Sequence, residues 1–453
     1  MGFKSPAKMF KRLARALKPK HKCPAPPPKP ALTPTPQKRM MSLPELPLDV
    51  YEVIIDFVWP DRDALLACAL TCRAWHARSR ANLFCRVELY NLTQLSHYSA
   101  QLAADARVGH ALRELYVTPY HSQSQLLGAF PFELAAAGRL PALTRLRVDI
   151  RRDFYPYIHP DFYPALACFT GVTTLELWRV QFPTLGDFAA LVCALPGLRS
   201  LACWQVDWVK KTYDAGALRD RKQCLRLHSL ELRDMDWSDA FADWLFMAVT
   251  VQELRSVSML GVATKDVEYI EHLLEAAGSS VRCLEIGIVP RRSARPRTKI
   301  MSQWEGDVGT YPRLVHNTSL ASLGLHLDQK GDWASGLLSQ SSFPAVREIT
   351  IHLPRLRKPT KVKHIRLDAL DSILAQPQFD GVRCLIVECD AGADTPAHMD
   401  AYKSEVSSRL PLSCGRGVVA IRPRKAVEPL MSPPRPLVTK SKFEPKPELW
   451  DPY

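Results

Sequence analysis

The sequence predicts an α/β fold in which a short three-helix module precedes a solenoid with a curved, mostly parallel sheet. Two observations support this prediction. Apolar residues recur at helical spacing within residues 42–89. Across residues 90–421, segments of the form Φ-x-x-L-x-Φ, where Φ is apolar, recur ten times with starts 24 to 39 residues apart, and helical stretches separate them. With 453 residues, 47 % of them hydrophobic, the chain can bury extensive cores.

The net charge of +14 is concentrated at the two ends of the chain. Residues 1–41 hold eleven Lys or Arg and no acidic residue, and residues 422–453 hold seven against four acidic residues. Residues 42–421 carry 42 basic and 42 acidic residues, so we expect no basic groove and no specific nucleic-acid partner. No apolar run approaches the ~20 residues of a membrane span, which argues against a membrane-spanning protein.

Both ends are predicted to be disordered. Residues 1–41 join the basic segment "KMFKRLARALKPKHK" to the polyproline-like "PAPPPKPALTPTPQK", which cannot build a core. Nuclear import, binding to an anionic membrane surface and mitochondrial targeting stay open as roles for the basic segment. Residues 422–453 are also rich in proline.

Residues 42–89 are predicted to form three short helices. Pro47 marks the start of the first helix, apolar residues such as Ile54 follow at helical spacing, and Pro60 breaks it. The segment "ALLACAL" then supplies a second helix and "CRAWHARSRANLF" a third, for which Thr71 is the expected N-cap. Because three such helices bury little surface alone, we expect another component to cover part of their apolar surface.

This module resembles the F-box. The stretch "LPLDVYEVIIDFVWPDRDALLACALTCRAWHARSRANLF" has the Leu-Pro start, the Ile/Leu helix, the Leu-rich second helix and the Cys-x-x-Trp of that family, with Asp49 where Glu is commoner. The resemblance covers about 45 residues and implies docking onto a Skp-type adaptor of a cullin–RING ubiquitin ligase. The residues expected to contact the adaptor are Leu46, Pro47, Val50, Ile54, Val58, Leu65, Leu66, Leu70 and Trp75.

The following region is predicted to be the repeat solenoid. Its clearest copies are "VTTLELWRVQF" (172–182), "LRSLACWQVDW" (198–208) and "LHSLELRDMDW" (227–237). Looser copies include "VQELRSV" (251–257), and the leucine at the fourth position should be buried in each copy. The pattern resembles irregular leucine-rich repeats, but Val180, Val206 and Met235 stand where those repeats usually carry Asn. The turn amides must therefore find other acceptors.

The residues between the apolar ones should face the concave side of the sheet. Tyr, Trp and Arg at such positions are the residue types that dominate protein-binding hot spots. We expect a protein substrate to contact Tyr116, Arg147, Trp178, Trp204 and Arg233. The alternative is that these side chains pack under loops or chain ends. Two loop segments, "KKTYDAGALRDRKQ" and "RLRKPTKVKH", are expected to add contacts.

No catalytic motif is apparent, so we predict no enzyme activity and no cofactor. The sequence contains no GxSxG, HExxH, P-loop or GxGxxG. The twelve cysteines show no CxxC spacing, which argues against structural zinc and a disulfide framework. His326 and His352 occupy equivalent repeat positions and are interpreted as a surface pair, so no metal site is predicted.

These features together predict a substrate-recognition subunit of a Skp–cullin–F-box type ubiquitin ligase, located in the cytoplasm, the nucleus or both. The three helices would bind the Skp-type adaptor, and the repeats would bind a protein substrate whose identity the sequence does not reveal. Two alternatives remain. One is an interaction scaffold outside any ligase, and the other is a nucleic-acid- or membrane-associated protein that uses the basic N-terminal segment.

Overall fold

The computed structural model describes residues 47–59, 61–119, 125–138, 140–150, 162–210, 224–289, 311–328, 331–340, 343–356, 359–389 and 396–424. The predicted disordered ends therefore lie outside the described residues, apart from residues 422–424. Of these, Arg422 and Pro423 belong to the last strand. Most of the first predicted contact loop, beyond Lys210, lies outside them as well. Within the described residues, no helix is both long and apolar enough to cross a membrane.

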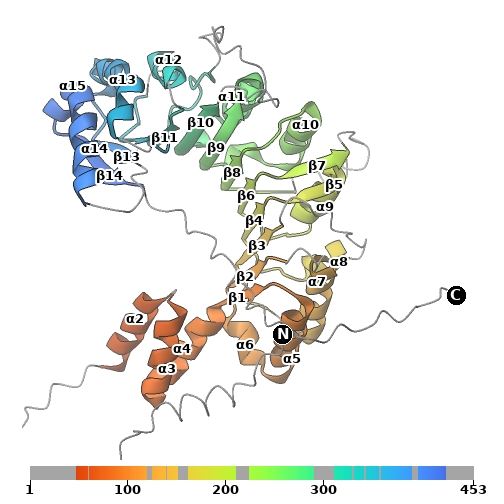
Figure 1. Cartoon of the computed structure of the whole chain (residues 1–453). Coiled ribbons are helices and arrows are strands. Elements are labelled where there is room, and N and C mark those ends of the chain that lie inside the picture. The colour runs from red at the N-terminus through yellow and green to blue at the C-terminus, as the bar shows by residue number, and fades with distance from the viewer. Residues whose placement is uncertain are drawn as a thin grey trace, which may run out of the picture. The chain divides into compact units, whose positions relative to one another are not determined.

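The predicted parallel sheet is confirmed. Among the described residues, twelve strands lie side by side in the order β1-β2-β3-β4-β6-β8-β9-β10-β11-β12-β13-β14, and every neighbouring pair is parallel (Figure 1). A second, two-stranded sheet pairs β5 with β7. The strands of the large sheet are β1 (Arg86–Leu89), β2 (Glu114–Val117), β3 (Arg145–Asp149), β4 (Thr174–Trp178), β6 (Ser200–Trp204), β8 (Ser229–Arg233), β9 (Ser256–Ala263), β10 (Cys283–Val289), β11 (Ser322–His326), β12 (Glu348–His352), β13 (Cys384–Cys389) and β14 (Val419–Pro423). The small sheet contains β5 (Gln181–Thr184) and β7 (Asp207–Lys210).

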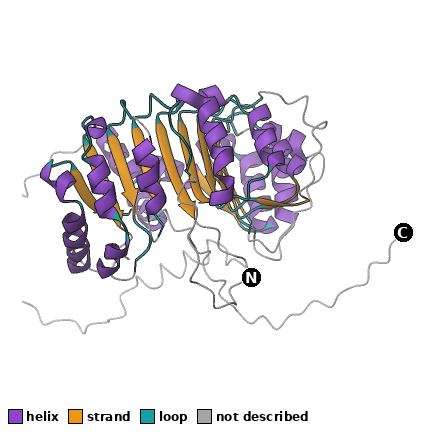
Figure 2. Ribbon diagram, turned by 90° about the horizontal axis from the view of Figure 1, so that it is seen from above, coloured by secondary structure: helices purple, strands orange, loops and turns teal. Residues whose placement is uncertain are grey.

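The helices between the strands lie along one side of the sheet (Figure 2). This arrangement is typical of a solenoid, in which each strand–helix unit buries its apolar side against its neighbours. The helices that follow the N-terminal module are α5 (Leu92–Ala104), α6 (Ala106–Ala111), α7 (Gln125–Ala137), α8 (Phe162–Ala167), α9 (Leu185–Cys193), α10 (Asp239–Ala248), α11 (Val267–Ala277), α12 (Asp332–Gln340), α13 (Leu367–Leu374), α14 (Pro396–Arg409) and α15 (Pro411–Gly415).

The core runs between the sheet and these helices. Leu175, Leu201 and Leu230, the fourth residues of the clearest repeats, are all buried and pair in register across β4, β6 and β8. One predicted register is wrong. Leu230 pairs with Val257, so Leu254 is the first apolar residue of its repeat and not the fourth. Leu254 and Val257 are both apolar and three residues apart, so the sequence pattern alone could not show which of them is the fourth residue of the repeat.

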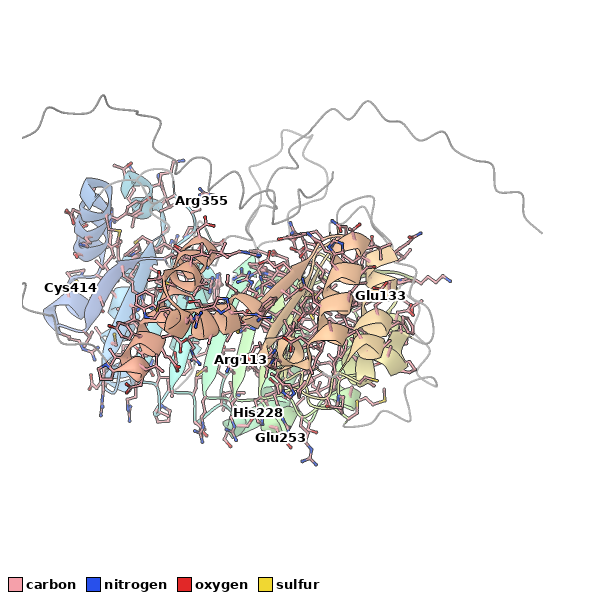
Figure 3. The ribbon with its side chains drawn as sticks, turned by 90° about the horizontal axis from the view of Figure 1, so that it is seen from below. Arg113, Glu133, His228, Glu253, Arg355 and Cys414 are labelled. Atoms are coloured by element: carbon pink, nitrogen blue, oxygen red, sulfur yellow. The ribbon has the colours of Figure 1, made fainter. Side chains whose placement is uncertain are left out.

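Backbone hydrogen bonds tie each repeat to the next. The carbonyl of Arg113 accepts from the amides of Thr144 and Arg145, and the carbonyl of His228 accepts from those of Arg255 and Ser256, at 2.9 to 3.0 Å (Arg113 and His228 are labelled in Figure 3). The parallel register is thereby set at the end where the strands begin.

The turns after β4, β6 and β8 satisfy their amides without the usual asparagine. Arg179, Gln205 and Asp234 adopt the left-handed conformation, with φ of 56°, 53° and 50°, and the equivalent residue of β9 is Gly261 with φ of 70°. Each of the three amides donates to a carbonyl of the next strand: Arg179 to Trp204 at 2.6 Å, Gln205 to Arg233 at 2.9 Å and Asp234 to Leu260 at 2.8 Å. The neighbouring repeat thus supplies the acceptor that the sequence required.

The N-terminal module contains three helices, α2 (Leu48–Val58), α3 (Arg62–Thr71) and α4 (Arg73–Cys85). Asp56 holds α2 against α4, because its carboxylate accepts from the Arg78 guanidinium and from the Asn82 amide. Ile55 is buried between the helices. The predicted cap of α4 is wrong: Cys72 is the N-cap and provides no side-chain hydrogen bond, while the Thr71 hydroxyl donates back to the carbonyl of Ala67.

Candidate functional site

The first candidate surface is apolar and lies on α2 and α3. Twelve large hydrophobic side chains are exposed in the described residues, and seven of them belong to these two helices. Phe57, at 84 % exposed, is the most exposed of them. We call this set the α2–α3 apolar surface: Leu48, Val50, Val53, Ile54, Phe57, Leu66 and Leu70.

The predicted adaptor-contacting residues differ in how exposed they are. One is placed wrongly: Leu65 is only 1 % exposed, because it turns into the module between the helices, so it cannot contact a partner. Val58 and Trp75 are half-buried, with the Trp75 ring against Tyr51 at 5.3 Å between ring centroids, and Leu46 lies outside the described residues. The exposed members are Pro47, Val50, Ile54, Leu66 and Leu70.

Three residues of the α2–α3 apolar surface were not predicted as contacts. Leu48, Val53 and Phe57 all lie on α2, whose apolar residues extend around the helix and not along one stripe. A helix whose apolar residues extend beyond a single stripe must be covered by more than one neighbour. That signal was present in the sequence and would have identified them.

The second candidate surface is the face of the sheet opposite the buried leucines. Its side chains form two rows, because the fifth and seventh residues of successive repeats pair in register. The fifth-position row is Glu88, Tyr116, Arg147, Glu176, Ala202, Glu231, Ser258, Glu285, Gly324, Thr350, Ile386 and Ala420. The seventh-position row includes Asp149, Trp178, Trp204, Arg233, Leu260, Gly287, His326, His352, Glu388 and Arg422.

The structure brings all five predicted substrate contacts into one cluster on these rows. The rings of Trp178 and Trp204 are half-buried and meet edge to face, 3.9 Å between centroids and 82° between planes. The Arg147 guanidinium lies 4.5 Å from the centre of the Trp178 ring, and that of Arg233 lies 4.2 Å from Trp204. Arg147 also stacks on Tyr116 at 4.7 Å. We call these five residues the aromatic–arginine cluster.

Two members of the cluster are less accessible than predicted. Tyr116 is 4 % exposed and Arg147 is 9 % exposed. Tyr116 is covered because the guanidiniums of Arg86 and Arg147 lie over its ring, at 4.1 and 4.7 Å. The surface that a partner can reach is therefore centred on Trp178, Trp204 and Arg233.

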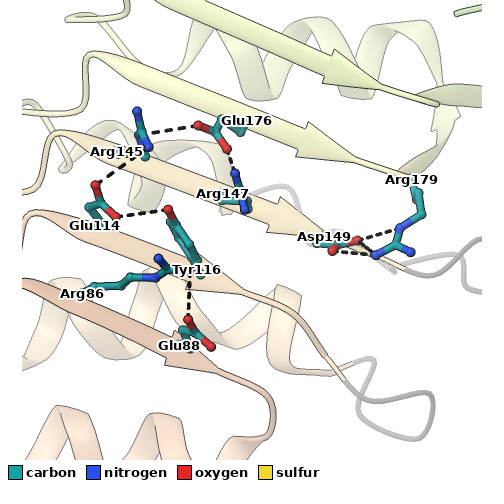
Figure 4. Close-up of polar contacts among 9 residues, drawn as sticks. All are labelled: Arg86, Glu88, Glu114, Tyr116, Arg145, Arg147, Asp149, Glu176 and Arg179. Carbon is teal, nitrogen blue, oxygen red and sulfur yellow. Dashed lines mark hydrogen bonds and ion pairs between the residues drawn. The ribbon is translucent and has the colours of Figure 1, made fainter. Parts of the chain in front are cut away.

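Ion pairs hold this part of the face in place (Figure 4). Glu176 accepts from Arg147 Nε at 2.5 Å and lies 3.5 Å from Arg145 Nε. Asp149 is fully buried and accepts from Arg179 through both carboxylate oxygens, at 2.7 Å each from Nη2. The pairing with Glu176 fixes Arg147, the arginine stacked on Trp178, so less side-chain entropy would be lost on binding.

A third group of polar side chains lies further along the same rows. The rings of His326 and His352 are stacked, 3.9 Å between centroids, and the Nε2 atom of each lies 3.4 Å from Glu285 Oε1. The interpretation of the histidines as an exposed surface pair is wrong, since their side chains are 16 % and 10 % exposed. Burial lowers the pKa of His326, and the adjoining imidazoles lower the pKa of Glu285.

Comparison with known proteins adds little to this geometry. No protein-family profile matches the chain, and no curated protein matches it. Among solved structures, a chain in the crystal structure of the yeast Rad7 and Elc1 complex is similar, with 12 % identity and a TM-score of 0.31 over 77 % of this chain and 91 % of that one. A likeness this distant carries no argument about function, which rests here on the surfaces themselves.

Proposed function

We propose that this protein is the substrate-recognition subunit of a Skp–cullin–F-box type ubiquitin ligase. In this proposal the α2–α3 apolar surface docks on a Skp-type adaptor, and the aromatic–arginine cluster binds a protein substrate. The chain performs no chemistry itself: it brings the substrate close to the other subunits, which raises the effective concentration of the reacting groups. It would act in the cytoplasm, the nucleus or both.

The observation that carries the proposal is the concentration of exposed apolar side chains on two neighbouring helices. Seven of the twelve large hydrophobic side chains exposed in the described residues lie within α2 and α3. Soluble proteins rarely leave such a contiguous patch uncovered unless a partner binds it. Four of the predicted adaptor contacts, chosen for their resemblance to the F-box, belong to this set, and a fifth, Pro47, is exposed just before α2.

The open face of the sheet supports the substrate-binding half of the proposal. Half-buried tryptophans with stacked arginines offer a large, rigid contact area at low entropic cost. Burial also lowers the pKa of Arg233 and raises that of Glu231, its neighbour on β8. A binding partner would further desolvate this pair, so it contributes more to specificity than to affinity.

The test is adaptor binding by full-length protein carrying Phe57→Asp or Leu70→Asp. Both side chains are largely exposed, so neither change should lower the melting temperature. Placing an unpaired carboxylate in an apolar interface should weaken adaptor affinity at least ~30-fold, a loss of the size expected at a hot spot. Isothermal titration calorimetry with a purified Skp-type adaptor measures the affinity directly.

The matched control is Leu412→Asp, which places the same charge at an exposed leucine of α15. It should bind the adaptor like the wild type. Failure of the wild-type protein to bind, or equal binding by the Phe57→Asp variant, would refute the proposal. A salt-dependent affinity for nucleic acid in the absence of adaptor binding would instead favour the role for the basic N-terminal segment.

A further inference from the structure

We propose that Glu285, His326 and His352 form a binding site for a zinc ion on the open face of the sheet, with one coordination position left for water. This site is separate from the aromatic–arginine cluster and does not depend on a role in ubiquitin transfer. In the described residues these three form the one group of His, Cys, Asp or Glu side chains whose ligand atoms all lie within 4.8 Å of one another.

Two of the three distances between the ligand atoms suit a tetrahedral ion, and all three are within 4.8 Å. Zinc binds imidazole nitrogen and carboxylate oxygen at about 2.0–2.1 Å, so two ligands of a tetrahedral site lie about 3.3–3.4 Å apart. Glu285 Oε1 lies 3.4 Å from the Nε2 atoms of both His326 and His352. The two imidazole planes are now inclined by 22°, and rotation about the soft terminal torsion of each side chain would turn both lone pairs toward one ion.

Two glycines make this convergence possible. Glu285 is on β10 and His352 is on β12, so the carboxylate must cross β11 to reach the second imidazole. It crosses at Gly324, where an added Cβ would lie 2.6 Å from Glu285 Cγ. At Gly287 an added Cβ would lie 2.8 Å from the Cβ of His326. Any side chain at Gly324 or Gly287 would therefore displace one of the proposed ligands.

One of the proposed ligand atoms is buried without an aligned partner. Among the described residues, His326 Nε2 has no aligned hydrogen-bond partner although it is buried. A buried polar atom without such a partner costs free energy, and coordination to an ion would remove that cost.

A second layer of groups surrounds the ligands. Glu388 Oε2 lies 3.0 Å from His352 Nδ1, which has no aligned hydrogen-bond partner among the described residues, so a turn of the ring would align the two. Glu388 is itself held by Arg422 at 2.8 and 2.9 Å. The Ser258 hydroxyl donates to Glu285 Oε2 at 3.0 Å. A carboxylate behind a ligating histidine is the usual outer partner in zinc sites, where it fixes the ring and raises its basicity.

One neighbour opposes the ion. Arg424 Nη2 lies 3.2 Å from His326 Nδ1 and adds a positive charge beside the site. Zinc on Nε2 would leave the proton on Nδ1, which would then face another donor, so Arg424 must turn away when the ion binds. Removing this guanidinium should therefore tighten zinc binding, the opposite of what loss of a supporting residue would do.

The experiment titrates metal-free, full-length protein with Co²⁺, read by its visible absorption, and then with Zn²⁺ in competition. We expect one tetrahedral ion per chain, without the near-ultraviolet band that thiolate coordination to cobalt produces. His352→Asn should weaken binding at least ~100-fold, and Glu388→Gln, which alters an outer partner alone, should weaken it ~10–100-fold. Gly324→Ala should also weaken it although all three ligands remain, and Arg424→Ala should tighten it.

The matched control is His316→Asn, since His316 lies 3.7 Å from Glu275 but both side chains are more than half exposed. It should bind cobalt like the wild type. No tetrahedral cobalt spectrum, a spectrum dominated by thiolate, or an unchanged spectrum in His352→Asn would overturn the proposal. Circular dichroism of each variant checks that the fold is kept.

Discussion

Replacing Trp178 or Trp204 with alanine should cost moderate stability, because each ring is half-buried on the open face. Trp204→Ala removes one stacked guanidinium, worth about 0.5–1 kcal/mol, and one edge-to-face ring pair, worth about 0.5–1.5 kcal/mol. These two contacts account for about 1–2.5 kcal/mol, and the apolar area that the half-buried ring hides adds to the loss. The double-alanine variant should show a coupling of about 0.5–1.5 kcal/mol, the ring pair itself, since the two centroids are 3.9 Å apart.

The comparison residue is Trp244 of α10, which is fully buried against Phe188 and Phe241. Its replacement by alanine should cost about 3–5 kcal/mol, since a core cavity is left behind. Native-state hydrogen exchange of the amides in β4, β6 and β8 measures all variants locally, which matters because a repeat protein need not unfold in one step.

The interpretation of the two tryptophans as binding residues fails if Trp204→Ala costs as much as Trp244→Ala. The rings would then belong to the core, and the binding surface would have to be sought elsewhere. If the loss is moderate, the same double variant should weaken capture of the substrate by about 2–4 kcal/mol while adaptor affinity is unchanged. The two measurements together distinguish packing from recognition.

Two further predictions concern the turns and the N-terminal module. Gly261→Ala should destabilise the protein by about 1–2 kcal/mol, since φ is 70° there and the new Cβ would lie 2.0 Å from Asp234 Oδ1. Gln205→Gly should be neutral or stabilising, because glycine adopts the same left-handed conformation without strain. Urea denaturation that ranks the stabilities of the two variants in the reverse order would contradict this. The Arg78 guanidinium lowers the pKa of Asp56 from 3.8, so the ion pair contributes stability above that pH and loses it as pH falls through the lowered value. The melting temperatures of the wild type and Asp56→Asn should therefore differ at pH 6, and the difference should shrink as the pH falls below 3.8. A difference that stays constant would refute the role of the pair.

Much of the fold could be predicted because the repeats carry a strict alternation. Leu175, Leu201 and Leu230 were predicted to be buried and are, since residues two apart on a strand share a face and parallel neighbours stack in register. The same alternation accounts for the adjacency of Trp178 and Trp204. Periodicity within one strand, combined with register between strands, was enough for these features.

Other features depend on packing that a linear pattern does not contain. Leu65 is apolar and at helical spacing like Leu66, and only the packing angle of α3 decides which of the two faces inward. The approach of Glu285 to His352 spans two strand spacings and depends on the missing side chain at Gly324. An alignment of the fifth and seventh residues of every repeat would have shown that Glu285, His326 and His352 come from three successive repeats and face the same side of the sheet.

The open face is divided by residue chemistry into two parts with different binding capacities. From β2 to β8 the two rows present aromatic rings and guanidiniums, which suit extended contact with a protein surface. Leu260 then interrupts the polar side chains, and Glu285, His326 and His352 of β10 to β12 converge beside Gly287 and Gly324. A solenoid permits this division because its contacts are short-range along the array, although Glu285 reaches His352 two strands away, so residues on distant stretches of the face can change without disturbing each other. Under the two proposals, the aromatic part would serve recognition while the imidazole part would hold an ion, and loss of one should leave the other intact.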